Sequence, residues 1–314
     1  MSKFLARRLV QIIPTLLVIF TVLFILAYLM PGDPLRAKLG EEYERIDPVV
    51  LEQMKEDMGL NRPFAVQYVD FLGQMLRFDL GTSMIYKQPV IDIIGYRFPR
   101  TLQLMLGGML VSLMIGIPAG IISAVRQYSW IDNGLMLFAL IGVSMPVFWQ
   151  ALIMQLFLTQ EKYGVALFPV AGFGGIEHMV LPSIVLGTNL AAIIARVTRS
   201  AMLDVIHMDY IKTARSKGLS ERTVLMRHQV RNALIPVVTV IGLQVAGLMT
   251  GSLVTETVFN WPGLGRAIVP AIQNRDTPVI MGVLMFGAIA YIVVNLITDL
   301  LYALIDPRVR YAKN

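Results

Sequence analysis

Long apolar runs alternate along this chain with short charged connections. A transmembrane helix needs about 20 mostly apolar residues to cross a hydrocarbon core about 30 Å thick. A charged side chain near the bilayer centre costs roughly 2.5 to 3.5 kcal/mol, so runs without charge are the most informative. Six such runs occur: Leu9–Met30, Thr101–Val125, Gly134–Gln160, Met179–Ala195, Ala233–Thr255 and Thr277–Thr298. The pattern predicts an all-α membrane protein with six transmembrane helices, five of them in a core at residues 101–303.

Several residues inside these runs are expected to shape the helices. Proline removes a backbone donor and kinks or breaks a helix, which neighbouring helices in a bundle tolerate. We therefore expect irregularities at Pro14, Pro118, Pro146 and Pro182. Glycines four residues apart permit close helix contact, although such pairs are frequent by chance. The pairs are Gly116 with Gly120 and Gly247 with Gly251.

The first apolar run follows the basic residues Lys3, Arg7 and Arg8, as the apolar region of a signal peptide does. It spans 22 residues, however, and no small-x-small cleavage site follows it. We therefore predict that residues 1–30 form a cytoplasmic tail and an uncleaved first transmembrane helix.

The distribution of Lys and Arg predicts the orientation in the membrane. With residue 1 in the cytoplasm, the inner segments carry 15 Lys and Arg, whereas the two short outer loops carry three, namely Lys162, Arg266 and Arg275. Because short cytoplasmic loops are enriched in these residues, both ends of the chain, including the tail 304–314, are predicted to be cytoplasmic. The remaining nine lie in residues 31–100, a connection long enough to have little influence on topology.

Residues 31–100 form a long outer connection with helix signals of its own. Asp47 and Pro48 are typical of a helix start, and Gly59 is typical of a helix end. Apolar residues then recur at helical spacing from Phe64 to Met75, which indicates a second amphipathic helix. We predict an extracytoplasmic helical segment that caps the bundle; contact with an extracytoplasmic partner is the alternative.

The composition agrees with a polytopic membrane protein in contact with a lipid bilayer. Hydrophobic residues make up 56% of the 314 residues and charged residues 15%, against about a quarter charged in soluble domains. The net charge of +6 lies beside and between apolar runs, which points to lipid head groups and not to nucleic acid. Cysteine is absent, which excludes disulfides and thiolate chemistry.

Motifs for catalysis within this chain are absent. There is no Gly-Lys-Ser or Gly-Lys-Thr phosphate loop, so ATP is not expected to bind here by that route. His178, His207 and His228 lack metal-ligand spacing, and we expect no bound metal. Ser144 and Ser252 lack the flanking glycines of a nucleophile elbow. The sequence predicts neither a catalytic residue nor a resident cofactor.

Uncharged polar residues do enter the apolar runs. They are Gln155, Asn189, Gln244, Thr250, Ser252 and Asn295. In hydrocarbon such groups need partners, so hydrogen bonding between helices is the simpler interpretation. Lining of a polar translocation path is the alternative, for which the candidates are Asn189, Gln244, Thr250 and Ser252.

A polar stretch, residues 196–235, separates the fourth run from the fifth and carries eight of the 27 Lys and Arg residues. Residues 208–217 favour a helix that Gly218 would end, and Ser220 would cap a second helix. Tyr210, Ala214 and Gly218 follow each other at i, i+4 spacing, with basic residues beside them. Such a stripe is a surface that another protein can approach closely. The alternative is a basic loop that rests on anionic lipid.

The connection after the fifth run, Glu256–Pro278, contains Phe259, Trp261 and the turn sequence Pro-Gly-Leu-Gly. Exposed aromatic residues there suit an interfacial belt or a plug over a pore mouth. We favour the structural interpretation; contact with a binding protein is the alternative.

Several segments, taken in this order, resemble one family. DYIKTARSKGLSERTVLMRHQVRNALIP resembles the cytoplasmic "EAA" loop of binding-protein-dependent ABC importer permeases, in the version of the branch that takes up dipeptides, oligopeptides, nickel and glutathione. The resemblance extends over nearly the whole chain, through FLARRLVQIIPTLL, MPGDP, GLNRPFAVQYVDFL, FDLGTS, ETVFNWPGLGR and NLITDLLYALIDPRVRY. The general loop pattern has Glu-Ala-Ala, then three residues, then glycine. This chain has Lys212, Thr213 and Ala214 before Gly218, so the glutamate is absent, as is usual in the peptide branch.

This resemblance implies a type I ABC importer permease fold in a bacterial or archaeal cytoplasmic (inner) membrane. The chain would form half of a translocation pathway with a second homologous permease subunit. Two ABC ATPase subunits would use ATP and Mg²⁺, and an extracytoplasmic substrate-binding protein would deliver the solute. The coupling helix seated in the ATPase would comprise Tyr210, Thr213, Ala214, Arg215, Lys217, Gly218 and Leu219.

Two other classes of protein remain as alternatives. A self-sufficient secondary transporter or channel is disfavoured by the lack of internal repeats and of charge within the apolar runs. An intramembrane hydrolase is disfavoured by the lack of a positioned nucleophile and base.

Overall fold

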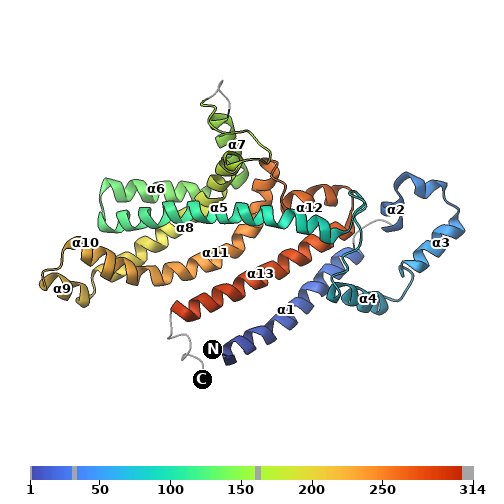
Figure 1. Ribbon diagram of the computed structural model, residues 1–314, viewed down its shortest axis with the longest axis horizontal. Coiled ribbons are helices and arrows are strands. Elements are labelled where there is room, and N and C mark those ends of the chain that lie inside the picture. The colour runs from blue at the N-terminus through green and yellow to red at the C-terminus, as the bar shows by residue number, and fades with distance from the viewer. Residues whose placement is uncertain (1, 30–33, 160–163, 306–314) are drawn as a thin grey trace. The chain divides into compact units, whose positions relative to one another are not determined.

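The computed structural model describes residues 2–29, 34–159 and 164–305, and most of these residues are helical (Figure 1). Within these ranges there is no strand, only an isolated antiparallel bridge between Thr82 and Pro89. The chain divides into two compact units, of which unit 1 contains residues 1–99 and 263–292 and unit 2 contains residues 100–262 and 293–314. The predicted all-α fold is confirmed.

Unit 1 contains the outer helices and parts of two long ones. Its elements are α1 (Ser2–Leu29), α2 (Pro34–Leu39), the 3-10 helix η1 (Gly40–Arg45), α3 (Pro48–Asp57), α4 (Phe64–Leu76), the start of α5 (Val90–Val125), α12 (Leu264–Gln273) and the first part of α13 (Thr277–Ile305). The predicted start of α3 is confirmed, because the Asp47 side chain accepts a hydrogen bond of 2.8 Å from the Val49 N–H. The second amphipathic helix that was predicted from Phe64 to Met75 is α4.

Two contacts organise unit 1. An aromatic cluster joins α1 to α4, where the Phe24 ring lies 5.2 Å from the Phe64 ring and 5.4 Å from the Phe71 ring. The buried Asp276 carboxylate, at the turn between α12 and α13, accepts hydrogen bonds from the Ser83 hydroxyl at 2.5 Å and the Ile85 N–H at 3.0 Å. The loop before α5 is thereby attached to the start of α13.

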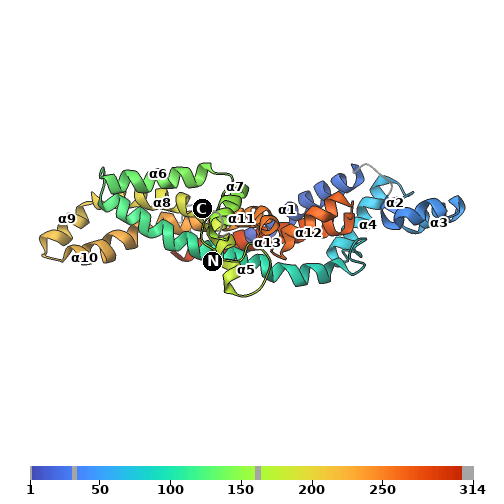
Figure 2. The same ribbon diagram turned by 90° about the horizontal axis from the view of Figure 1, so that it is seen from above.

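Unit 2 contains the remaining helices. They are the rest of α5, α6 (Trp130–Ser144), α7 (Val147–Leu158), α8 (Ile176–Ile206), α9 (Asp209–Ser216), α10 (Glu221–Thr223), the π-helix η2 (Val224–Val230), α11 (Arg231–Val258) and the end of α13. In Figures 1 and 2, α9 and α10 lie at one end of this unit, and the turn between α5 and α6 lies at the same end.

Four helices in the described ranges are long and apolar enough to cross a membrane: Val10–Leu29, Val90–Val125, Ile176–Ile206 and Thr277–Thr298. A fifth candidate is the pair of α6 and α7, if these helices form one broken span. The predicted first and last runs therefore agree closely with the structure. The predicted run 233–255 lies within α11, several of whose side chains lie outside the described part, so its role as a sixth span stays a prediction.

Two helices are longer than the apolar runs that predicted them. Helix α5 begins at Val90 instead of Thr101 and so includes Asp92 and Arg97, which had been assigned to the outer segment. Helix α8 continues past Ala195 to Ile206, so the first part of the polar stretch 196–235 is a continuation of α8. The apolar runs locate only the charge-free part of each helix, because a helix can extend beyond the hydrocarbon core.

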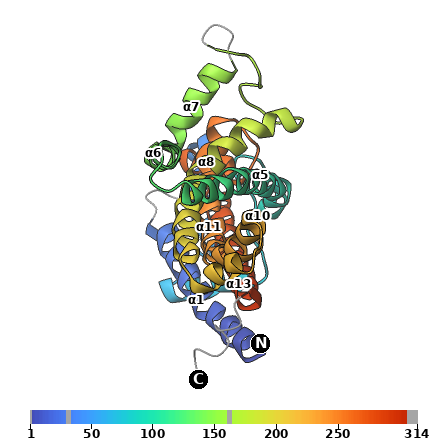
Figure 3. The same ribbon diagram turned by 90° about the vertical axis from the view of Figure 1, so that its left-hand side faces the viewer.

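The run predicted at Gly134–Gln160 is not one straight helix. Helix α6 ends at Ser144, α7 begins at Val147, and the two are bent by 109° (Figure 3). Met145 is extended, with φ of −80° and ψ of 126°, as a residue before proline favours. The prediction of a break is thus confirmed at Pro146, whereas the helices run on through Pro14, Pro118 and Pro182.

Helix α8 lies at the centre of unit 2. Its buried residues, among them Leu186, Leu190, Ile194 and Met202, form one apolar core with residues of α5 and α11. The predicted close contact at Gly116 and Gly120 is confirmed. A Cβ atom at Gly120 would lie 2.5 Å from the Thr198 Cβ and 2.6 Å from the Ala195 carbonyl oxygen. Gly247, from the other predicted pair, is exposed in this chain.

Gly120→Ala should therefore destabilise the protein, because the added methyl group meets the backbone of α8. Overpacking of this kind costs about 1 to 3 kcal/mol. The temperature at which half of the detergent-solubilised protein leaves the monodisperse peak should fall by several degrees. Gly134→Ala in α6 is the matched control, since a Cβ there meets nothing within 4 Å. Equal transition temperatures for the two variants would contradict this account of the α5 and α8 contact.

Candidate functional site

The polar loop between α8 and α11 folds as two short helices with defined ends. Helix α9 ends before Gly218, whose φ of 76° is the left-handed conformation that favours glycine. The Ser220 hydroxyl oxygen then accepts a hydrogen bond of 3.4 Å from the Thr223 N–H at the start of α10. Both predicted helix boundaries are confirmed.

One side of α9 packs against its own chain. Ile211 is 0% exposed and Ala214 is 6% exposed, and both lie against Val224 at the start of η2. Ala214 was predicted to belong to a surface that another protein approaches. In this structure its methyl group instead fills the contact between α9 and η2, so the two helices are held together by their own small apolar core.

The remaining side chains of α9 are exposed. Tyr210, Thr213 and Lys217 succeed each other at i, i+3 and i+7 and are exposed, with Tyr210 at 43%. The Tyr210 hydroxyl also accepts a hydrogen bond of 3.2 Å from the Asn232 side-chain amide at the start of α11. We call Tyr210, Thr213 and Lys217 the α9 outer face. Of the predicted stripe of Tyr210, Ala214 and Gly218, this structure exposes Tyr210 and Gly218 and buries Ala214.

The other predicted coupling residues lie at the edges of this face. Leu219 is 39% exposed, and the Arg215 guanidinium forms two hydrogen bonds to the Glu221 carboxylate, at 2.9 and 3.2 Å. The latter pair links the end of α9 to α10. Lys212 donates a hydrogen bond of 2.9 Å to Asp209, and its ammonium lowers the pKa of that exposed carboxyl.

The loop continues into α11 without a break. The π-helix η2 follows α10 directly and ends at Val230, where the backbone is helical, with φ of −57° and ψ of −46°. Helical backbone therefore extends from Glu221 to Val258. On the other side, only His207 and Met208 separate α8 from α9.

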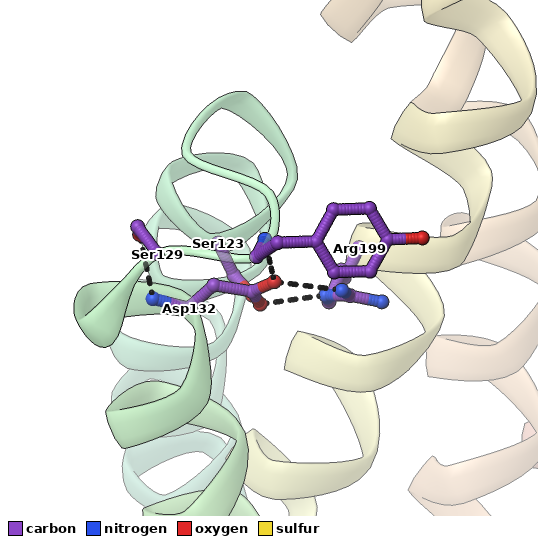
Figure 4. Close-up of polar contacts among 5 residues, drawn as sticks. Ser123, Ser129, Asp132 and Arg199 are labelled. Atoms are coloured by element: carbon purple, nitrogen blue, oxygen red, sulfur yellow. Dashed lines mark hydrogen bonds and ion pairs between the residues drawn. The ribbon is translucent and has the colours of Figure 1, made fainter.

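A buried ion pair joins Asp132 on α6 to Arg199 on α8 (Figure 4). The Arg199 Nε and terminal nitrogen donate to the two Asp132 carboxylate oxygens, each at 2.7 Å. The Ser123 hydroxyl on α5 also donates to this carboxylate, and so does the Tyr128 N–H, at 2.9 Å. The Asp132 side chain is 2% exposed and that of Arg199 is 24% exposed. Removing one partner of such a buried pair costs about 3 to 5 kcal/mol.

The predicted pathway residues have different surroundings. The Asn189 side-chain amide donates to the Gly142 carbonyl at 3.3 Å, which is a hydrogen bond between α8 and α6. Ser252 is 1% exposed, and Gln244 is half-buried on α11. The side chain of Thr250 lies outside the described part.

The connection after α11 is buried rather than exposed. Trp261 is 2% exposed, its indole N–H donates to the Arg100 carbonyl at 2.9 Å, and its ring lies edge-on to Phe173 at 4.9 Å. Phe259 is 1% exposed. The expectation of exposed aromatic residues was therefore wrong, and the favoured structural interpretation agrees with these contacts.

Sequence reasoning missed Asp132 and Arg199 as partners. Asp132 lies just before the apolar run that begins at Gly134, and Arg199 was counted only among the basic residues of the polar stretch 196–235. A signal existed for Asp132, because Ser129 and Asp132 have the spacing of a capping box, and the Ser129 hydroxyl accepts a hydrogen bond of 3.2 Å from the Asp132 N–H. Nothing local indicated that its carboxylate reaches a residue 67 positions later.

The sequence matches known proteins over nearly its whole length. Residues 116–311 match the family described as "Binding-protein-dependent transport system inner membrane component", and residues 1–105 match the corresponding N-terminal family. The glutathione transport system permease protein GsiC of Pectobacterium atrosepticum is 42% identical over 312 residues, which cover 99% of this chain and 100% of that protein. The dipeptide permease protein DppB of Alkalihalophilus pseudofirmus is 40% identical and the oligopeptide permease protein AppB of Bacillus subtilis is 42% identical, with the same coverage.

Solved structures share the fold. Two inward-facing crystal forms of the MetNI methionine ABC transporter align with TM-scores of 0.57 and 0.55 at 18% sequence identity, the first covering 68% of this chain and 96% of the other. At this identity the similarity shows the fold alone, which is that of an ABC importer permease of type I. The family match, these relatives and the long apolar helices show that the chain belongs to the family of inner membrane components of binding-protein-dependent transport systems.

Proposed function

We propose that this chain is the permease subunit of an ATP-driven importer of small peptides, and that it forms half of the translocation pathway. Membership of the family supports the general role. The observation that carries the mechanism is α9, a short helix at the end of two long helices, with one side packed on its own chain and the other side exposed. A helix of this kind is suited to seat in another protein.

ATP binding and hydrolysis would take place on other polypeptides. The sequence has no Gly-Lys-Ser or Gly-Lys-Thr motif, so two ABC ATPase subunits would bind ATP and Mg²⁺. A second homologous permease would complete the pathway, and an extracytoplasmic binding protein would deliver the solute. The excess of Lys and Arg supports a cytoplasmic position for the α9 loop and for both ends of the chain.

Movement of the ATPases would reach the pathway through rigid elements. When ATP binding closes two ATPase subunits, each displaces the α9 outer face that it holds. Because Ile211 and Ala214 join α9 to η2, the displacement passes into α11 as well as α8. Rigid-body motion of these helices would then exchange inward-open and outward-open arrangements.

Peptides are the proposed substrate class because the relatives agree on it. Three permeases of at least 40% identity are named for glutathione, dipeptides and oligopeptides, and all three solutes contain peptide bonds. Gln244 and Thr250 on α11 remain candidates for the pathway, whereas Asn189 already bonds the backbone of α6.

Reconstitution tests the function as a whole. Liposomes with this permease, its partner permease, both ATPases and the binding protein should accumulate a labelled dipeptide or tripeptide only with ATP and Mg²⁺. Liposomes with this chain alone should accumulate none. Uptake by the chain alone, without nucleotide, would show instead a self-sufficient carrier or channel.

Gly218→Glu should leave the permease in the membrane but weaken its hold on the ATPase. A Cβ at Gly218 meets nothing within 4 Å in this chain, so the added carboxylate would enter open space beside the α9 outer face, where the ATPase is proposed to bind. Like charges or clashes at an interface cost several kcal/mol, so ATPase co-purification and uptake per permease should fall roughly tenfold or more.

Gly40→Glu is the matched control for that variant. Gly40 has a similar φ of 59°, and a Cβ there also meets nothing within 4 Å, but it lies in unit 1. It should cause the same backbone strain without loss of ATPase binding. Equal losses in the two variants would contradict the assignment of Gly218 to the coupling site.

Two variants of Tyr210 distinguish a contact with the ATPase from the contacts that Tyr210 makes within the loop. Tyr210→Ala removes the exposed ring, and truncation of an aromatic hot spot costs about 2 kcal/mol or more, so the affinity for the ATPase should fall roughly thirtyfold. Tyr210→Phe loses only the bond to Asn232 and should stay near the wild-type affinity. Titration of labelled ATPase against permease in nanodiscs measures both. Equal affinities for the alanine variant and the wild type would exclude the ring from the interface.

A further inference from the structure

The buried cluster of Ser123, Asp132 and Arg199 is separate from the α9 outer face. We propose that Asp132 and Arg199 are positioning residues that clamp the turn between α5 and α6 to α8, so that the ends of these three helices move as one body when α9 is displaced. The inference rests on the proposed function, because it assigns these residues a part in passing ATPase movement to the pathway.

The Asp132 carboxylate has no capacity left for a ligand. One oxygen accepts from the Ser123 hydroxyl and the Arg199 Nε, and the other accepts from the Tyr128 N–H and the second Arg199 nitrogen (Figure 4). Two carboxylate oxygens offer about four lone-pair sites, and all are used. The Asp132 side chain is also only 2% exposed, so its carboxylate is suited to hold neighbouring segments in place and not to bind a solute or an ion.

The clamp joins three segments at the place where α9 attaches. Ser123 belongs to α5, Asp132 to the first turns of α6, and Arg199 to α8. Arg199 precedes the end of α8 at Ile206 by two turns of helix. Beside it, Thr198 packs where Gly120 brings the α5 backbone close. A steric contact and a directional polar contact therefore fix the same stretch of α8.

The chemistry of the Asp132 and Arg199 pair favours a role in fixing helix orientation over a role in stabilising the fold. Replacement of a buried ion pair by apolar residues of similar volume is often neutral for stability, so the pair itself is weak evidence of a stabilising role. A bidentate arginine and carboxylate pair, however, fixes both the distance and the rotation of the two groups, which a lysine cannot do. Arg199 thus sets the rotation of α8 relative to α6.

Arg199→Lys tests this role in the complete importer. The variant keeps the charge, and the α9 outer face stays intact, so the ATPase should bind and hydrolyse ATP as in the wild type. Solute taken up per ATP hydrolysed should fall roughly 2- to 30-fold, the range in which residues of a coupling network act. An unchanged ratio would overturn the proposal. Arg62→Lys is the matched control, since Arg62 pairs with Asp70 at 2.8 Å on the exposed surface of unit 1 and should leave the ratio unchanged.

The triple variant Ser123→Ala, Asp132→Leu and Arg199→Met separates positioning from folding. It removes both charges together with the buried Ser123 hydroxyl that bonds the carboxylate, and it fills the site with apolar groups, so the permease should assemble in wild-type amounts. The ratio of solute to ATP should nevertheless be low, because the directional contact is gone. A wild-type ratio in this assembled variant would show that the pair serves folding only.

A measurement on the intact pair does not depend on any variant of the clamp. The chain has no cysteine, so single cysteines at the exposed positions Trp130 and Ser200 accept spin labels selectively. The distance between the labels should stay constant between nucleotide-free and ATP-bound importer. A change of more than about 5 Å, one helical turn, would show that α6 and α8 move apart and would overturn the clamp. If the wild-type importer shows no ATP-driven uptake at all, the proposed function fails instead.

Discussion

The close approach of the α5 and α8 backbones is the contact on which unit 2 depends. Lipid tails are as apolar as leucine, so helices in a membrane associate through packing and small residues rather than through a hydrophobic force. Gly116 and Gly120 allow this packing, because a side chain at either position would meet Ile194 or Thr198. At that separation, α8 carries Arg199 to the carboxylate of Asp132. The steric contact therefore sets the geometry that the ion pair requires.

The features that the sequence predicted correctly are those with local causes. Asp47 caps the helix that follows it, Ser220 caps α10, and Gly218 ends α9 in a left-handed conformation. Each depends on residues within a few positions of one another, so spacing and residue type are enough to find it. The same holds for the first and last apolar runs, whose bounds come close to those of the helices.

The features that it predicted incompletely depend on partners distant in sequence or on the length of a helix beyond the membrane. A charge-free window located the core of α5 but not its start at Val90, and it joined α6 to α7 across the break at Pro146. Trp261 was assigned to the surface because nothing in its neighbourhood shows that Arg100 and Phe173 cover it. Likewise, spacing placed Ala214 on the accessible side of α9, but Val224 packs over it.

The connection of α9 to α8 differs from its connection to α11, and this difference bears on the position of the clamp. Towards α11, the core of Ile211, Ala214 and Val224 bridges the four non-helical residues 217–220, and helical backbone then continues from Glu221. Towards α8, only His207 and Met208 connect the helices, and a non-helical pair of residues can absorb a rotation. A force that enters α8 is useful only if α8 cannot turn independently of its neighbours. The buried bidentate pair at Arg199 supplies that restraint on the α8 side, where the backbone itself does not.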